Sequence, residues 1–105
     1  MTVRPPLDSE VDELATIWHR GWQDAHAAIL PPELARHRTL ESFRERLRDG
    51  ISDVRVAGSP GHPLGFCFTK DAEIYQLYVS SDARGTGVAA AFPLEVWRYE
   101  KRVRS

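Results

Sequence analysis

The chain has 105 residues, of which 42% are hydrophobic and 28% are charged, and its 14 Lys and Arg against 15 Asp and Glu leave a net charge of −1. This composition predicts one small globular domain that buries about 60–70% of its unfolded surface, and it gives no reason to expect a nucleic acid or an anionic membrane as a partner. The single cysteine, Cys67, excludes an internal disulfide, and neither a membrane-spanning run nor a signal peptide is recognisable, so we expect a cytoplasmic protein.

The first half of the chain predicts a short strand and two helices. Residues 2–4 favour a strand, which two prolines stop. Asp8 or Ser9 is then expected to cap a helix, and a second helix is expected after Thr39, with Gly50 as its end. The apolar residues of the first helix recur at helical spacing: Val11, Leu14, Ala15, Trp18, Trp22, Ala25 and Ile29.

In the second half the apolar period changes to two residues, which predicts strands. Residues 54–56, 64–69 and 73–79 are separated by a Gly- and Pro-rich loop and by a tight turn at Lys70 and Asp71, so we expect a three-stranded antiparallel meander. A last helix is expected from Gly87 onward. Pro93 falls inside it and would cost about 3 kcal/mol unless the helix bends or breaks there.

A glycine-containing turn, residues 84–89, connects the last expected strand to the last helix. It reads Arg84-Gly85-Thr86-Gly87-Val88-Ala89. The first N–H groups of a helix have no partner inside the helix, and the helix dipole favours negative charge at that end. The two glycines let the backbone approach a ligand closely, and the arginine can pair with a phosphate. This turn therefore predicts a site for a phosphorylated ligand.

The order of these elements resembles the first two-thirds of a GNAT-type N-acetyltransferase. The acetyl-CoA motif of that superfamily is Arg/Gln-x-x-Gly-x-Gly/Ala, on the turn between a strand and a helix, and residues 84–89 match it. The resemblance covers about residues 2–92. It implies an α+β, GNAT-like acyl-CoA N-acyltransferase fold in shortened form, with a mixed, mainly antiparallel sheet and flanking helices, as one domain over residues 1–105.

The resemblance also implies positions for the cofactor. The pyrophosphate of acetyl-CoA would bind the backbone of the turn. The strand segment before the turn would lie beside the pantetheine arm and the acetyl carbonyl. The candidate cofactor-binding residues are thus Leu77, Tyr78, Val79, Arg84, Gly85, Thr86, Gly87, Val88 and Ala89.

An amine nucleophile would attack the thioester directly, and Glu73 is the candidate catalytic base, acting directly or through water. We expect the strand face of Glu73 also to carry Tyr75, Leu77 and Val79. Trp22 and Tyr75 are candidate contacts to the acceptor substrate. Simpler interpretations stay open, because Glu73 could face solvent and Trp22, Tyr75 and Tyr78 could serve only in packing. No metal site is expected.

A complete GNAT enzyme continues with a fifth strand, a fourth helix and two further strands, and its usual general-acid tyrosine lies in that part. These elements have no counterpart in the 105 residues, so we expect a truncated domain, either natural or the product of a frameshift. Strand 74–79 would keep an unpaired edge, which predicts self-association, as a homodimer. Two functions remain open: an acetyl-CoA-dependent N-acetyltransferase acting on an amine of a small molecule or protein, and a non-catalytic remnant that binds CoA weakly or self-associates. The sequence does not identify the acceptor.

Overall fold

The computed structural model describes residues 1–26, 31–71 and 73–104 of the chain. Its four-stranded antiparallel sheet has the order β1-β2-β3-β4, which confirms the expected meander. The N-terminal strand joins this meander, since Val3 pairs with Ala57 and Arg4 with Val56. The strands are β1 (Val3–Arg4), β2 (Val54–Ala57), β3 (Gly65–Lys70) and β4 (Glu73–Val79).

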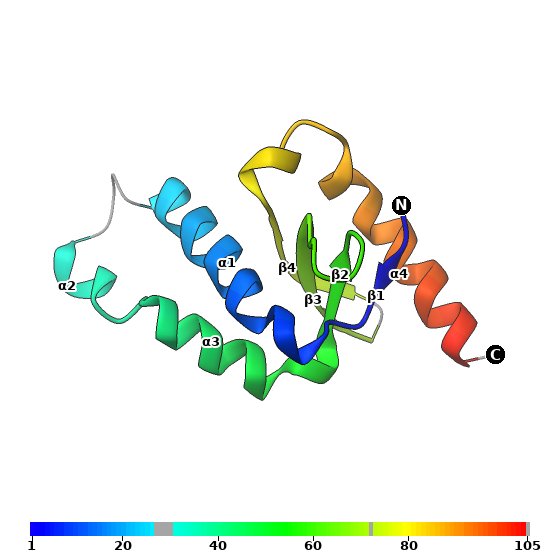
Figure 1. Cartoon of the computed structure of the whole chain (residues 1–105), viewed down its shortest axis with the longest axis horizontal. Coiled ribbons are helices and arrows are strands. Elements are labelled where there is room, and N and C mark those ends of the chain that lie inside the picture. Colours follow the sequence, from blue (N-terminus) through cyan, green and yellow to red (C-terminus); the bar gives the residue numbers. More distant parts are fainter. Residues whose placement is uncertain (27–30, 72, 105) are drawn as a thin grey trace.

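Two helices cover one face of the sheet, and a third covers the other (Figure 1). The first face carries α1 (Val11–His26) and α3 (Leu40–Asp49), and the second face carries α4 (Val88–Arg104). A short helix, α2 (Pro32–Ala35), lies between α1 and α3 along the chain. β4, the last strand of the meander, therefore forms one edge of the sheet and leads directly into the turn before α4.

Local signals explain where these helices begin and end. The backbone N–H of Ser42 donates to the hydroxyl oxygen of Thr39 at 3.1 Å, and Gly50 follows the last residue of α3, so both predicted boundaries are confirmed. The predicted cap of the first helix is wrong, because Asp8 and Ser9 lie inside a separate 3-10 turn, Asp8–Glu10, that precedes α1. Ile29, expected on the first helix, lies outside the described residues.

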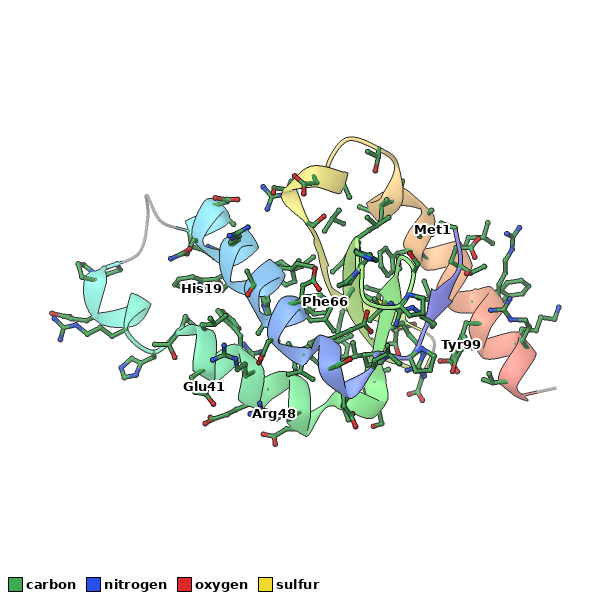
Figure 2. The ribbon with its side chains drawn as sticks, in the orientation of Figure 1. Met1, His19, Glu41, Arg48, Phe66 and Tyr99 are labelled. Atoms are coloured by element: carbon green, nitrogen blue, oxygen red, sulfur yellow. The ribbon has the colours of Figure 1, made fainter. Side chains whose placement is uncertain are left out.

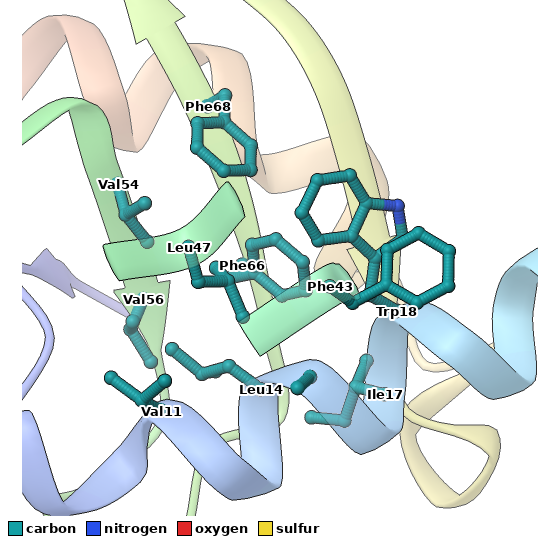
Figure 3. Close-up of a cluster of buried hydrophobic side chains, with 11 residues drawn as sticks. Val11, Leu14, Ile17, Trp18, Phe43, Leu47, Val54, Val56, Phe66 and Phe68 are labelled. Atoms are coloured by element: carbon teal, nitrogen blue, oxygen red, sulfur yellow. The ribbon is translucent and has the colours of Figure 1, made fainter. Parts of the chain in front are cut away.

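The larger core cluster lies between α1, α3 and the sheet (Figure 3). The Trp18 ring is at its centre, with ring centroids 4.7 Å from Phe43 and 5.3 Å from Phe68. Burial of each such side chain contributes about 1.5–3 kcal/mol. A smaller cluster of Val3, Ala57, Cys67, Phe92 and Val96 joins the sheet to α4. The two clusters fix α1 and α4 against opposite faces of the strands that lead into the turn.

Helix α4 continues through Pro93 to Arg104. The proline ring is exposed, whereas the neighbouring Phe92 and Val96 are fully buried against the sheet. The missing N–H of Pro93 leaves the carbonyl of Ala89 without its helical partner, and Ala89 is itself exposed, so water can satisfy that oxygen. The packing of the buried face thus carries the helix past its proline.

Strand β4 contains a bulge. Phe68 pairs with Gln76 and Thr69 pairs with Ile74, so Tyr75 is the extra residue that no β3 residue opposes. An extra residue reverses the alternation of side chains along the strand. Beyond the bulge, Leu77 packs on the α4 side, while the Tyr75 ring lies 5.9 Å from the Phe68 ring on the α1 side.

Candidate functional site

The glycine turn lies between the end of β4 and the start of α4. A 3-10 turn, Ser81–Ala83, follows the strand, and Val88 begins the helix. Gly85 and Gly87 have φ angles of +81° and +88°, a backbone region that favours glycine. A Cβ added at either glycine would meet no atom within 4 Å. The backbone conformation therefore favours glycine at both positions, and the space above the turn is open to a ligand.

The start of α4 directs donors out of this turn. The N–H of Ala91 donates to the carbonyl of Gly87 at 3.1 Å, which is the first hydrogen bond of the helix. The N–H groups of Val88, Ala89 and Ala90 precede it and have no acceptor within the helix. The hydroxyl and N–H of Thr86 both bond to the carbonyl of Ala83 and hold the turn in shape. The arrangement presents backbone donors to an anion at the positive end of the helix dipole.

Arg84 supplies the only side-chain charge of the motif. Its side chain is 44% exposed, and one guanidinium nitrogen lies 2.9 Å from a carboxylate oxygen of Asp24 on α1. Sequence reasoning missed this contact, because 60 residues separate the two and neither lies in a recognisable pattern. An exposed ion pair of this kind is worth about 0–1 kcal/mol. A doubly charged phosphate could therefore compete with Asp24 for Arg84.

A cavity of about 340 Å³, with both charged and apolar lining residues, adjoins the turn on the α1 side. Arg20 and Arg84 border it, and Glu13 and Asp82 offset their charge. Its remaining wall includes His62 in the β2–β3 loop and the end of β4 at Val79. Two guanidinium groups at one cavity can attract a phosphorylated ligand, with weaker net attraction than a purely basic cavity would have.

Two side chains of the segment Leu77–Val79, those of Leu77 and Tyr78, are packed within the fold. Leu77 packs against the α4 cluster. Tyr78 lies on the opposite face, where its ring stacks on Phe66 at 6.0 Å and lies so close to Gly21 that a Cβ there would be 2.8 Å from it. Gly21 is thus required for the crossing of α1 over β4. What this edge strand can offer a ligand is its backbone, because an edge strand leaves N–H and C=O groups unpaired on its outer side.

Glu73 and Tyr75 lie at the other end of β4. Glu73 is exposed and lies opposite Lys70 of β3, and Tyr75 is 58% exposed. The expectation that one strand face carries Glu73, Tyr75, Leu77 and Val79 is wrong, because the bulge separates Leu77 from Tyr75. Sequence alternation gave no warning of the bulge. Ile74 packs on the α4 side of the sheet. Because neighbouring side chains of a strand alternate between the two faces, Glu73 and Tyr75, on either side of Ile74, lie on the α1 side.

Trp22 lies on α1, half buried, with its ring 5.5 Å from His26 and 6.3 Å from Phe43. The rings that it contacts are thus not those that Tyr75 contacts, so the two candidate acceptor contacts have different surroundings. Among the described residues, no three His, Cys, Asp or Glu side chains lie close enough to hold a metal ion. Within the same part of the chain, none of the helices combines the length and the apolar character that crossing a bilayer requires.

Comparison with solved structures identifies the fold. The chain superposes on a GCN5-related N-acetyltransferase (Aminotransferase, Class-II) from Rhodopseudomonas palustris with a TM-score of 0.66 and 21% identity, over 99% of this chain and 68% of that one. It also matches apo YjaB from Escherichia coli (TM-score 0.62, 25% identity, 89% of this chain and 63% of that one). A third match is the PaiA N-acetyltransferase from Thermoplasma acidophilum in complex with coenzyme A (TM-score 0.63, 16% identity, 95% and 71%). No protein-family model and no curated protein matches the sequence. The chain has a GNAT-like fold and spans about two-thirds of the length of these structures.

Proposed function

We propose that this chain is an acetyl-CoA-dependent N-acetyltransferase that transfers an acetyl group to an amine of a small molecule or a protein. One observation carries the proposal. The two positive-φ glycines stand between an edge strand and the start of a 17-residue helix, in a fold shared with an N-acetyltransferase that was solved with coenzyme A. The open space at both glycines fits the close approach of a pyrophosphate.

In this proposal the turn and β4 hold the donor substrate. The backbone N–H groups of Gly85, Gly87, Val88 and Ala89 receive the pyrophosphate, while the N–H of Thr86 stays bonded to Ala83. Arg84 exchanges Asp24 for a phosphate oxygen. The backbone of Leu77 and Val79 holds the pantetheine arm, because the side chain of Leu77 is packed within the fold and Val79 forms part of a cavity wall. Tyr78 contributes its backbone and positions the strand through its ring contacts.

The acceptor would be activated at the other end of β4. When bound, acetyl-CoA would supply an acetyl thioester, whose carbonyl carbon gains a bond from the amine nitrogen while its bond to sulfur breaks and coenzyme A leaves as a thiolate. An amine is protonated at neutral pH and must lose a proton before it can attack. Glu73 is exposed at the start of β4 and can take that proton through a water molecule.

Calorimetric titration of coenzyme A into the protein tests the turn. We expect binding near one per chain in the wild type, about tenfold weaker binding in Arg84→Ala, and unchanged binding in Arg36→Ala, an exposed arginine in the α2–α3 connection. Equal affinities in the two variants would show that Arg84 does not contact the ligand. Absence of any binding to the wild type would refute the proposed cofactor site.

Acetyl transfer tests Glu73. With a responsive amine acceptor, Glu73→Gln is expected to lower kcat by 10²-fold or more while leaving the affinity for coenzyme A unchanged, since general-base catalysis contributes about 10²–10⁴-fold. Glu45→Gln, at an exposed glutamate of α3, serves as the control. An unchanged rate in Glu73→Gln would remove this residue from the mechanism.

A second candidate function is a non-catalytic module that binds coenzyme A weakly and self-associates. It is favoured by the position of β4 at the sheet edge and by the exposed apolar side chains of α4, which are Leu94, Trp97 and Val103 among the described residues. Edge strands can pair with another chain, so a homodimer remains our prediction, as does a cytoplasmic location. Light scattering at micromolar concentration should give twice the chain mass, and a monomer would contradict the dimer.

A further inference from the structure

A small pocket of about 220 Å³ opens beside the bulge of β4, on the face covered by α1 and α3. It lies away from the glycine turn, at the other end of the strand. Its size suits a ligand smaller than the drug-sized molecules that fill pockets of about 300–1,000 Å³. Its walls include three aromatic residues and three polar ones: Trp18, Phe68, Tyr75, Arg46, Asp49 and Gln76.

The side-chain oxygen of Gln76 is the first observation that points to a ligand at this pocket. This Oε1 atom is buried and has no hydrogen-bond partner, a condition that only one other side-chain atom, Arg55 Nε, shares among the described residues. Buried amide oxygens are nearly always paired, because burial removes their hydrogen bonds to water. The bulge is the reason for its position, since it places Gln76 opposite Phe68, whose ring faces the α1 side. Because Gln76 lines the pocket, a small rotation of its amide would let a ligand N–H reach this oxygen.

Arg46 is the second sign. Its guanidinium lies 4.5 Å from the centroid of the Trp18 ring, at the mouth of the same pocket. In the part of the chain that the structure describes, Arg46 enters no ion pair, as is also true of Arg20, Arg36 and Arg38. What distinguishes Arg46 is that it lies over the Trp18 ring in the wall of this pocket. A guanidinium held over an aromatic ring keeps its N–H donors available at its edge. A carboxylate is the partner that its forked geometry fits.

We propose that this pocket binds the acceptor substrate and that the acceptor carries a carboxylate next to its amine, as an α-amino acid does. The carboxylate would pair with Arg46. The amine would donate to Gln76 Oε1 and be attracted by the carboxylate of Asp49, one helical turn after Arg46. A short apolar side chain would contact the rings of Phe68 and Tyr75.

The assignment of this ligand as the acetyl acceptor rests on the proposed function. The pocket adjoins the strand segment, Leu77–Val79, that the proposal assigns to the pantetheine arm of acetyl-CoA. Gln76 directly precedes Leu77, and Glu73 lies on the same face of the strand. Each residue advances a strand by about 3.3 Å. An amine bound to Gln76 is thus only a few residues along the strand from both the donor segment and the candidate base. Binding of the amino acid itself requires no coenzyme A.

The test compares three probes by titration while the NMR signal of the Trp18 indole N–H is observed. L-Leucine has both groups, 3-methylbutylamine lacks the carboxylate and 4-methylpentanoate lacks the amine. We expect L-leucine to bind the wild type about tenfold more tightly than either analogue, the change expected for the loss of one charge-assisted hydrogen bond. No binding of L-leucine, or equal binding of L-leucine and 3-methylbutylamine, would overturn the proposal.

Two variants assign the contacts. Arg46→Met should reduce the affinity for L-leucine to that for 3-methylbutylamine. Gln76→Leu should weaken the binding of L-leucine about tenfold and leave the affinity for 4-methylpentanoate unchanged. Arg48→Met is the matched control, because Arg48, which is labelled in Figure 2, is 58% exposed and is not part of the pocket wall. An Arg46→Met variant that folds and binds L-leucine like the wild type would refute the carboxylate contact.

The two proposals can fail separately. If coenzyme A binds the turn and L-leucine shows no binding, the acceptor class is wrong while the cofactor site stands. If L-leucine binds with the expected dependence on Arg46 and coenzyme A does not bind, the pocket stands as an amino acid site and the acetyltransferase proposal fails.

Discussion

Glu10 offers a quantitative test of what holds the N-terminal strand in place. Its side chain is 2% exposed and accepts hydrogen bonds from both terminal nitrogens of Arg4 at 2.8 Å. It also accepts from the backbone N–H groups of Leu7 at 2.8 Å and Gly61 at 3.1 Å. One carboxylate thus joins β1, the turn before α1 and the loop between β2 and β3.

These contacts hold the pKa of Glu10 well below its ordinary value of 4.5, at about 2, with the Arg4 hydrogen bonds as the main cause. At 1.36 kcal/mol per pKa unit, the lowering of the Glu10 pKa from 4.5 to about 2 corresponds to about 3 kcal/mol of folding free energy. Because the folded-state pKa is lowered, this contribution is fully present above pH 4.5 and is lost as the pH falls toward 2. By pH 3.5 about 1.4 kcal/mol of it should be gone.

Urea unfolding of the wild type and of Glu10→Gln, followed by tryptophan fluorescence, measures this contribution. The variant keeps the shape of the side chain and loses its charge, so we expect a destabilisation of about 3 kcal/mol at pH 7. The difference between the two proteins should narrow by about 1.4 kcal/mol at pH 3.5. Glu45→Gln, an exposed change, should leave stability within about 0.5 kcal/mol. A difference that is the same at both pH values would show that Glu10 acts through packing alone.

Three further outcomes follow from the packing and the turns. Burial raises the pKa of Cys67 to about 12, so its thiol should react with a disulfide reagent at pH 8 only at the rate of unfolding; rapid labelling of the folded protein would contradict its burial. Phe43→Ala should lower the free energy of unfolding by about 3–5 kcal/mol, which denaturant titration can check, because this ring is fully buried against Trp18. Gly87→Ala should lower the free energy of unfolding by about 1–2 kcal/mol, from backbone strain alone. Gly58→Ala should lower it further, since the added Cβ would also lie 2.5 Å from the carbonyl oxygen of His62. Equal losses of stability in the two variants would refute the steric part of that reasoning.

The sequence alone predicted most of the local structure, because local structure depends on near neighbours along the chain. The 3.6-residue spacing of Leu14 and Trp18 indicated α1, Thr39 and Gly50 marked the ends of α3, and alternation indicated the three strands. The glycine turn was predicted for the same reason, since six consecutive residues define it. The resemblance to the GNAT superfamily followed from that turn and from the order of the elements, and the fold is confirmed.

Only the tertiary structure decided which side chains meet. The bulge at Tyr75 changes the face on which every later β4 side chain lies, and alternation cannot reveal an extra residue. The contacts of Arg84 with Asp24, and the shared pocket of Arg46 and Gln76, join segments that are far apart in the sequence. Such pairs depend on how α1 and α3 pack against the sheet, which is set by the volumes and shapes of buried side chains such as Trp18 and Phe66. The turn is therefore a property of the sequence, and the pocket at the other end of β4 is a property of the fold.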